Sequence, residues 1–411
     1  MKPTEVDVLI IGAGPAGSTA AALLRQQGFQ LLVVEKQVFP RFVIGESLLP
    51  HSMDLLREAG LLEAIQARGF MQKFGALFLR GNQACGFDFS DQFTSGWQYA
   101  YQVPRADFDL ALADAVEARG VPVLYGRQVT AVEFRDGRAC AAIEQPGKAI
   151  DNVRARFVLD CSGYGRVLPR LLSLEEPTRF PTREALFTHV THDRRPLGRE
   201  EGKIWVCIHP DGAWIWIIPF SNGKTSVGVV ATPEFFRHYP AEPQAQLRAA
   251  LMSDPNAGAR LANVQFAFPP QRISGYACAV KKLFGPQFAL VGNATEFLDP
   301  IFSSGVTLAL ASASRAAQVL TRHLRGQPVD WQTEYSDFVM QGINTFRACV
   351  NAWYDTSLHD VFFAAHRDPD IMKQLCSVLA GYVWDRNNPC VSQLERVLPL
   401  LARIVQGRDR K

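Results

Sequence analysis

The chain lacks the features that mark membrane-spanning and secreted proteins. Among its 411 residues, no uncharged apolar run reaches the roughly 18 residues that a membrane-spanning helix needs. The apolar stretch near the N-terminus is interrupted by a glycine turn at residues 12–17, unlike the continuous core of a signal peptide. We therefore expect no transmembrane segment and a cytoplasmic location.

Clustered cysteines and a dominant charge are also absent. The eight cysteines are scattered without a CxxC pair or a cysteine–histidine group, so we expect reduced core thiols and no metal site. The net charge of +3 is too small to indicate a polyanionic partner, and we expect no nucleic-acid binding. A hydrophobic content of 47% with 20% charged residues favours a well-buried α/β enzyme of two or three domains.

The most informative segment that is present lies near the N-terminus. An apolar run at residues 6–11 leads into a glycine motif and an Ala/Leu-rich stretch, and a second apolar run at residues 31–34 ends in Glu35. This order of strand, turn, helix, strand and acid predicts a dinucleotide-binding βαβ unit, in which Glu35 accepts hydrogen bonds from a ribose diol.

Each residue of the glycine motif has a physical task in such a unit. Gly12 allows the tight turn, Gly14 lets the backbone approach a pyrophosphate, and Gly17 lets the helix pack closely on the strand. The pyrophosphate then lies against the N–H groups of the helix N-terminus, where Pro15 and Ala16 stand.

Two later apolar strands end in polar turns, which is where parallel sheets bind ligands. They are residues 155–160, followed by Cys161-Ser162-Gly163, and residues 288–291, followed by Gly292-Asn293-Ala294. With the glycine motif, these strand ends resemble the FAD-dependent monooxygenase superfamily related to hydroxybenzoate hydroxylase. The resemblance implies FAD and an α/β fold: a Rossmann-like FAD-binding domain with an inserted β-sheet substrate domain and a C-terminal helical region.

We expect the FAD-binding domain to be discontinuous and to comprise residues 1–80, 98–171 and 280–330. The substrate domain would comprise residues 81–97 and 172–279. The C-terminal region would comprise residues 331–411, where apolar residues from Ile343 to Phe362 follow helical spacing and His359 is expected to be structural.

The same resemblance implies further cofactor contacts. Arg105 would lie over the flavin side, and Asn293 would meet the ribityl or pyrophosphate region. The superfamily usually has Asp at the latter position, so Asn293 keeps an acceptor and gains a donor but loses the charge. The remaining expected contacts are Arg41, Ser47, Val129 and Pro300.

Three segments resemble the flavin-dependent halogenases more narrowly. Residues 45–50, Gly-Glu-Ser-Leu-Leu-Pro, are similar to that family's mobile strap, although Ser47 and Pro50 would equally suit an ordinary helix entry. Residues 214–219 resemble its WxWxIP signature, and residues 297–305 resemble its FxxPxxSxG signature. The nearest resemblance is to the halogenase-like flavoproteins of aryl-polyene and flexirubin-type pigment biosynthesis.

The two signatures predict a wall and a tunnel. Trp214 and Trp216 share one face of a strand in a meander, and the family implies that they separate substrate from flavin; ordinary sheet core is the alternative. Phe302 would line the substrate tunnel at the position where tryptophan halogenases carry a Glu. The chain is therefore more similar to the branch that acts on phenolic or carrier-bound substrates.

The last signature also predicts an anion site. Ser304 and Gly305 precede a helix expected from residue 306 to about residue 323, so their N–H groups can stabilise a reduced flavin and hold a halide. Flavin binding without a halide is the alternative.

Lys73 matches the position of the family's catalytic lysine. An ammonium there would aim hypohalous acid by a hydrogen bond, or the amine would carry the halogen itself. Most lysines are solvated, but Phe70, Met71 and Phe74 flank this one and favour burial.

The resemblance thus implies an FAD-dependent oxidoreductase that uses reduced FAD and O2 to halogenate an electron-rich aromatic, in secondary-metabolite or pigment biosynthesis. The absence of a second glycine motif for NAD(P)H fits a separate flavin reductase as partner. Whether the aromatic or polyene substrate is tethered to an acyl carrier protein stays open. The alternatives are a hydroxylase acting on a similar substrate, a reductase of polyene or prenyl double bonds, and a flavin-binding partner without turnover.

Overall fold

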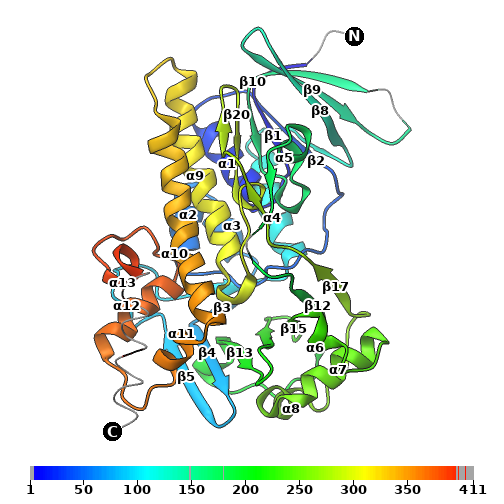
Figure 1. Cartoon of the computed structure of the whole chain (residues 1–411). Coiled ribbons are helices and arrows are strands. Elements are labelled where there is room, and N and C mark those ends of the chain that lie inside the picture. The colour runs from blue at the N-terminus through cyan, green and yellow to red at the C-terminus, as the bar shows by residue number, and fades with distance from the viewer. Residues whose placement is uncertain (1–3, 148–149, 179, 395–396, 398–402, 404–411) are drawn as a thin grey trace.

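The expected βαβ unit forms the centre of one eight-stranded sheet (Figure 1). Strand β1 (Thr4–Ile11) pairs in parallel with β2 (Leu31–Glu35) on one side and with β10 (Asp151–Asp160) on the other. Strands β7 (Val123–Tyr125) and β20 (Phe288–Leu290) extend the parallel part. This computed structural model describes residues 4–147, 150–178, 180–394, 397 and 403.

Long helices cover this sheet. Helix α1 (Pro15–Gln26) packs on β1, β2 and the longest helix, α9 (Ser304–Leu324). Helix α10 (Asp337–Tyr354) runs beside α9 along the molecule (Figure 1). The layers are helix on sheet, as expected for a Rossmann-like domain, and α9 begins two residues before the predicted residue 306.

A hairpin extends the same sheet on its far edge. Strands β8 (Gln128–Arg135) and β9 (Arg138–Glu144) are joined at Asp136 and Gly137, which have φ of 52° and 69°. Positive φ at both central residues is the geometry that an Asp-Gly hairpin turn favours. The hairpin brings Val129 towards the end of β2.

The expected meander forms the core of a second eight-stranded sheet. Its central strands are β12 (Glu184–Thr191), β13 (Ile204–Ile208), β14 (Trp214–Pro219) and β15 (Thr225–Ala231). They are antiparallel, and β14 and β15 are buried along their whole length. The outer strands are β4 (Gly75–Arg80), β5 (Gln83–Asp88), β16 (Gln265–Phe266) and β17 (Gln271–Ser274).

The second sheet begins earlier in the chain than expected. Strand β4 pairs in parallel with β13, so residues 75–80 belong to this sheet, although we had placed them in the segment 1–80 of the FAD-binding domain. The turn between β4 and β5 can be predicted from neighbouring residues. The parallel pairing of β4 with β13 joins segments far apart in the sequence, so no local pattern predicts it.

Smaller elements connect the two sheets. The two-stranded pairs are β3 (Met71–Lys73) with β6 (Ala100–Gln102) and β11 (Glu175–Glu176) with β18 (Ala279–Val280), and β19 (Phe284–Gly285) borders β20. The shorter helices are α2 (His51–Glu58), α3 (Leu62–Gln66), α4 (Arg105–Glu117), α5 (Val167–Leu171), α6 (Pro233–Phe236), α7 (Pro243–Ser253) and α8 (Pro255–Leu261).

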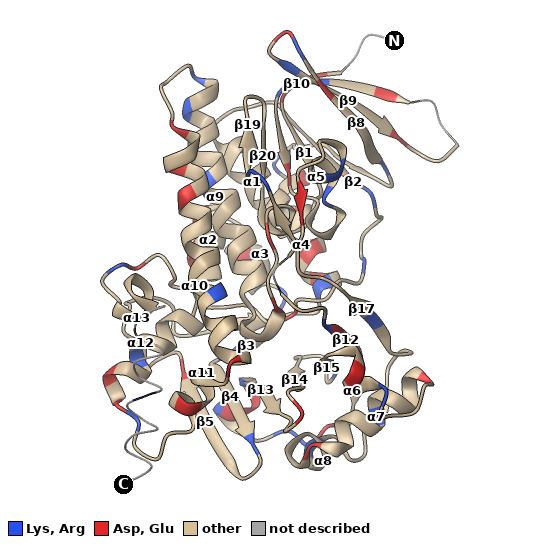
Figure 2. Cartoon of the chain, in the orientation of Figure 1, with Lys and Arg blue, Asp and Glu red and all other residues tan. Residues whose placement is uncertain are grey.

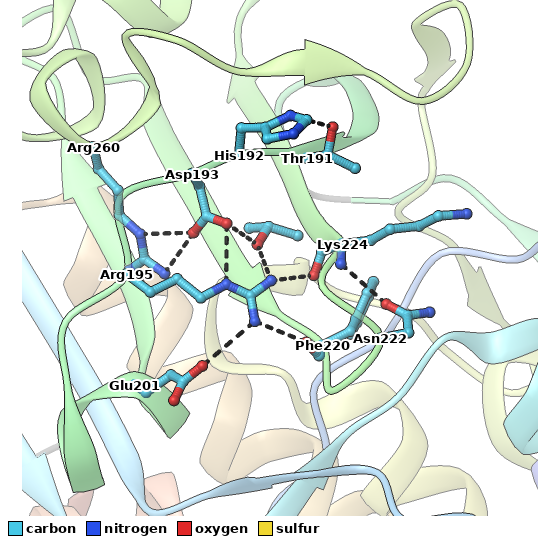
Figure 3. A network of polar contacts seen from close by, with 10 residues as sticks. Thr191, His192, Asp193, Arg195, Glu201, Phe220, Asn222, Lys224 and Arg260 are labelled. Carbon is cyan, nitrogen blue, oxygen red and sulfur yellow. Dashed lines mark hydrogen bonds and ion pairs between the residues drawn. The ribbon is translucent and has the colours of Figure 1, made fainter.

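A buried ionic cluster braces the second sheet (Figure 3). Asp193, just after β12, lies between the guanidinium groups of Arg195 and Arg260 at 3.0 and 3.1 Å, and it accepts a 2.8 Å hydrogen bond from Thr225 on β15. The side chains of Asp193 and Arg260 are each only 1% exposed. Helix α8 is therefore tied to the sheet by charge as well as by apolar packing.

The C-terminal region is helical as far as the structure describes it. After α10 come α11 (Ser357–Phe362), α12 (Pro369–Leu379) and α13 (Pro389–Ser392). His359 is buried with its ring 4.3 Å from that of Trp353, and burial lowers its pKa to about 4; its structural role stays a prediction. The helical prediction for residues 395–396, 398–402 and 404–411 lies outside the described residues.

Charged residues of both signs are distributed over the helices and both sheets in the view of Figure 2, in keeping with the small net charge. Among the helices described, none is both long enough and apolar enough to cross a membrane.

Candidate active site

A cavity of about 420 Å³ opens at the carboxyl ends of β1, β2 and β10, the edge where parallel sheets bind ligands. Its walls come from the glycine turn, the start of α9, the hairpin residue Val129 and the second sheet. One further wall is the connection from β2 to α2, residues 36–50, which contains the strap-like motif at residues 45–50. From here on we call this whole connection the strap.

The glycine turn has the shape that a dinucleotide requires. Gly12 has φ of +97°, and a Cβ there would lie 2.6 Å from the carbonyl oxygen of Cys161. A Cβ at Gly17 would lie 1.9 Å from the carbonyl oxygen of Gly12, so only glycine allows α1 to start this close to β1. No side chain caps α1 at Gly14, and its first-turn N–H groups are free to bind a phosphate.

Glu35 closes the turn from the end of β2. Its Oε2 accepts a 2.9 Å hydrogen bond from the N–H of Ala13, and its Oε1 accepts one of the same length from the N–H of Gln37. A carboxylate has about four acceptor positions, so both oxygens can still accept ribose hydroxyls.

Arg105 fixes the strap from α4. Its guanidinium makes a bidentate pair with Asp109, at 2.8 and 2.9 Å, and donates to the carbonyl oxygens of Ile44 and Gly45. Arg41, on the strap, reaches the same carboxylate at 3.0 Å. Both arginines line the cavity, as expected of cofactor-binding residues.

The loop before α9 forms the opposite end of the cavity. The carboxylate of Asp299 accepts a 3.0 Å hydrogen bond from the N–H of Ile301 and caps the short turn Pro300–Phe302. Ser303 follows with φ of 56°, and no side chain caps α9, which begins at Ser304. The N–H groups at Ser304 and Gly305 are therefore available to an anion at the cavity edge.

Two tryptophans of β14 form the wall on the side of the second sheet. Trp214 and Trp216 both line the cavity, with ring centroids 5.9 Å apart. The indole of Trp216 donates to Ser226 at 3.0 Å, and that of Trp214 donates to Tyr354 at 3.1 Å. Both rings are thus held by packing and by a hydrogen bond.

Most of the residues expected at the cofactor line this one cavity. They are Gly12, Gly14, Pro15, Ala16, Glu35, Arg41, Ser47, Arg105, Val129, Asn293, Pro300, Ser304 and Gly305. Gly17, Phe302 and Lys73 are absent from the described lining. Gly17 acts in packing, and Phe302 packs edge-on against Trp353, with ring centroids 5.9 Å apart, so its place in a substrate tunnel stays a prediction.

Lys73 lies behind the strap in a buried position. The residue is 2% exposed, and Nζ donates a 3.0 Å hydrogen bond to the carbonyl oxygen of Leu48, next to the cavity residue Ser47. The ring of Phe89 lies 5.5 Å from Nζ. Lys73 is therefore a buried strand residue and not a solvated loop lysine, and its burial lowers the pKa of the ammonium to about 7.

Many lining residues had no role predicted from the sequence, and Glu46, Tyr164 and Tyr276 are among the polar ones. Glu46 stands inside the strap motif, where its acidity was a visible signal that received no role. Tyr164 and Tyr276 come from loops of the two sheets, and nothing in their local sequence marks them.

Comparison with known proteins agrees with this geometry. A family model described as an FAD binding domain matches residues 5–335. Flavin-dependent halogenase armH3 of Armillaria mellea is 30% identical over 347 residues, 79% of this chain and 69% of the relative. The chain belongs to the flavin-dependent halogenase family. FAD is therefore the cofactor, and the protein is an FAD-dependent oxidoreductase of the halogenase type.

Two further similar proteins match nearly the whole chain. The 1H-pyrrole-2-carbonyl-[peptidyl-carrier protein] chlorinase of Pseudomonas fluorescens is 28% identical over 409 residues, 93% of this chain and 91% of the relative. A crystal structure titled flavoprotein/dehydrogenase, from Cytophaga hutchinsonii, is 48% identical with a TM-score of 0.96, covering 98% of this chain and all (100%) of that one. The structural similarity thus extends over 98% of this chain.

Proposed function

We propose that this halogenase-family protein transfers a halogen to an electron-rich aromatic ring that is presented as a carrier-protein thioester. The observation that carries the proposal is the burial of Lys73 directly behind the strap, with Nζ on the carbonyl oxygen of Leu48. Carrier-bound substrates are favoured because the pyrrole chlorinase, whose name specifies such a substrate, matches over nearly its whole length.

The residues of the cavity fit the cofactor from end to end. The glycine turn and the N-terminus of α1 would hold the pyrophosphate, Glu35 the ribose, and the start of α9 the flavin end. When bound and reduced, FAD supplies the reaction with O2 that makes the oxidant. A separate flavin reductase would provide the reduced cofactor.

The two ends of the proposed path have different electrostatic tasks. The N–H groups at Ser304 and Gly305 would hold the halide by hydrogen bonds and the partial positive charge of the α9 N-terminus. Lys73 would receive the oxidised halogen on the other side of the strap. With a pKa of about 7, the side chain is available both as an ammonium donor and as a neutral amine near neutral pH.

The tryptophan wall would keep the acceptor away from the flavin. Trp214 and Trp216 close the cavity on the side of the second sheet, so an aromatic ring would meet the halogen near Lys73. This separation supports halogenation over direct hydroxylation, which requires contact between substrate and flavin. Kinship with the halogenases of aryl-polyene and flexirubin-type pigments is the finer part of the proposal.

A reconstituted assay tests the proposal. The purified protein, FAD, a flavin reductase with NADH, O2 and bromide or chloride are incubated with pyrrolyl and hydroxybenzoyl carrier thioesters, and the carrier is weighed by intact mass spectrometry. Halide-dependent gain of one halogen is expected. Addition of one oxygen with or without halide would indicate a hydroxylase. Addition of two hydrogens without O2 would indicate a reductase. Absence of any product despite bound FAD would indicate a flavin-binding partner without turnover.

Lys73→Ala provides the matched variant for this assay. Halogen transfer should fall at least a hundredfold, while O2 consumption by the reduced cofactor should stay within about twofold of wild type. Lys224→Ala, which alters an exposed lysine in the turn between β14 and β15 that does not line the cavity, is the control. Halogenation by Lys73→Ala at the wild-type rate would remove Lys73 from the mechanism.

A further inference from the structure

Glu46 is a buried carboxylate of the strap that lies on the wall of the flavin cavity. Its side chain has no exposed surface, and Oε1 lies 2.8 Å from Nε2 of His189 on β12. The other oxygen, Oε2, is buried and has no hydrogen-bond partner among the described residues. Buried polar atoms are nearly always paired, so this oxygen indicates a donor that comes from outside the described chain.

His189 holds this carboxylate in a fixed place. Its imidazole is enclosed by the rings of Phe42, Phe220 and Phe268, with centroids at 5.5, 5.2 and 5.1 Å. A ring packed on three sides has few rotamers that keep these contacts. The orientation of Glu46 is therefore set by the second sheet, while its backbone belongs to the strap.

The neighbouring polar groups do not supply the missing donor. Arg105, the nearby cation, directs N–H groups of all three side-chain nitrogens to Asp109 and to the carbonyl oxygens of Ile44 and Gly45, and makes no hydrogen bond to Glu46 among the described residues. The Oγ of Ser47, the next residue, is likewise buried without a partner among the described residues and lines the same cavity. Two adjacent unpaired oxygens on one wall fit a ligand better than an isolated packing defect.

We propose that Glu46 is a cofactor-binding residue whose Oε2 accepts a hydrogen bond from the flavin cofactor, and that His189 is the residue that positions it. The inference rests on the FAD binding contained in the proposed function and on no step of halogen transfer. A flavin offers two kinds of donor: those present in both redox states, which include the ring N3–H, and those formed only on reduction. The ribityl hydroxyls are the same in both redox states, whereas the reduced ring carries N–H groups that the oxidised ring lacks.

The Glu46–His189 pair also connects the strap to the second sheet. Glu46 lies on the strap, and His189 lies on the second sheet, so a cofactor bound to Glu46 is held between both. Binding of FAD should then protect the strap as well as the glycine turn. Hydrogen–deuterium exchange of residues 41–48 should slow when FAD is added to the apoprotein.

Titration of the apoprotein with FAD tests the proposal. Glu46→Gln keeps the size of the side chain but replaces a charged acceptor by a neutral one, and we expect the Kd for FAD to rise about tenfold. His189→Phe keeps the ring packing but removes Nε2, and we expect a rise of about threefold to tenfold. Because both changes act through one carboxylate, their effects should not multiply. The Kd of the double variant should rise by much less than the product of the two single-variant factors.

The controls separate binding from folding. Glu63→Gln changes an exposed glutamate of α3 by the same chemistry and should leave the Kd unchanged. Thermal unfolding of each apoprotein identifies a variant that fails to fold, in which case Glu46→Asp, which retains the charge on a shorter side chain, replaces Glu46→Gln. Loss of halogenation in the reconstituted assay would not affect this result, since only FAD affinity is measured.

Anaerobic titration with reduced FAD distinguishes the two donors. A larger loss of affinity for reduced FAD in Glu46→Gln assigns the donor to an N–H formed on reduction, and the midpoint potential of the bound flavin should then fall by about 30 mV for each additional factor of ten. Equal losses in both redox states assign it to a donor common to both. A folded Glu46→Gln variant that binds both forms within twofold of wild type overturns the proposal.

Discussion

The hydroxyl of Tyr354, at the end of α10, donates a 2.8 Å hydrogen bond to the buried carboxylate of Asp299. The same hydroxyl accepts a 3.1 Å hydrogen bond from the indole of Trp214. The other oxygen of Asp299 accepts from the N–H of Ile301, in the turn that precedes Ser304. One chain of contacts thus connects the tryptophan wall, the C-terminal helices and the expected halide site.

Tyr354→Phe should weaken this connection. The variant leaves the N–H of Trp214 without an acceptor and Asp299 with one donor fewer, and an unpaired buried group costs about 1–3 kcal/mol. We expect a loss of that size in urea denaturation of the apoprotein, with weaker binding of FAD. Tyr239→Phe removes a hydrogen bond to Ser253 at the surface and should cost less than about 1 kcal/mol. Equal stabilities of the two variants would show that Tyr354 is not a structural link.

The buried amine of Lys73 makes stability depend on pH. Burial lowers its pKa from 10.5 to about 7, so between these values the unfolded chain binds a proton that the folded chain does not. The cost of burying the charge therefore grows as the pH falls from about 10 and is complete below about pH 7.

Lys73→Met removes that proton and should reverse the penalty. Relative to wild type, the variant should gain stability as the pH falls from 10 to 7, by up to about 5 kcal/mol at about 1.4 kcal/mol per pKa unit, with little further gain below pH 6. Urea denaturation of both proteins across this range measures the difference. Two parallel curves would contradict a lowered pKa for Lys73.

Much of the cofactor site could be predicted because its determinants are local. The turn at Gly12 and Gly17, the acid at Glu35 and the helix start at Ser304 each follow from short-range rules of conformation and hydrogen bonding. Residues 6–11 and 31–34 lie where they do because buried parallel strands read as continuous apolar runs. The order of these segments along the chain is therefore enough to predict the wall of the cavity at the ends of β1 and β2.

Contacts between distant segments could not be predicted in the same way. The parallel pairing of β4 with β13 has no signal in either strand, and it moved residues 75–80 into the second sheet. Glu46 meets His189, and Asp299 meets Tyr354, only after the strap and α10 have packed. Phe302 is expected in a tunnel from its place in a motif; its contact with Trp353 also comes from a distant segment, and the tunnel role stays a prediction.

Asp193→Asn tests the ionic cluster of the second sheet. The variant leaves the buried guanidinium of Arg260 without its counter-charge, and breaking a buried pair costs about 3–5 kcal/mol. We expect a loss of that order in chemical denaturation. Glu234→Gln, in the exposed pair with Arg237, is the matched control and should cost less than about 1 kcal/mol. A small effect in Asp193→Asn would mean that the cluster is solvated in solution.

Gly228 on β15 makes room for the ring of Trp216, its partner across the strands. A Cβ at Gly228 would lie 2.3 Å from Cζ2 and Cη2 of that indole and 2.7 Å from Cβ of Phe187. Gly228→Ala must therefore push the indole out of its place, break its hydrogen bond to Ser226 and reshape the cavity wall. Overpacking of this kind costs about 1–3 kcal/mol, and we expect weaker FAD binding as well.

A smaller ring at position 216 should relieve part of the clash that an alanine at position 228 creates. Trp216→Phe removes the two indole atoms that a Cβ at Gly228 would meet, while the approach to Cβ of Phe187 remains. The substitution should therefore be less harmful in the Gly228→Ala background than in wild type, by about 0.5–3 kcal/mol of coupling in a double-mutant cycle. Denaturation and FAD titration of the four proteins measure it. Gly86→Ala, on β5, where a Cβ would have only Leu77 Cδ1 nearby at 3.7 Å, should be tolerated. Additive effects at Gly228 and Trp216 would mean that the wall adapts to an extra methyl group and that Trp216 is not held by this contact.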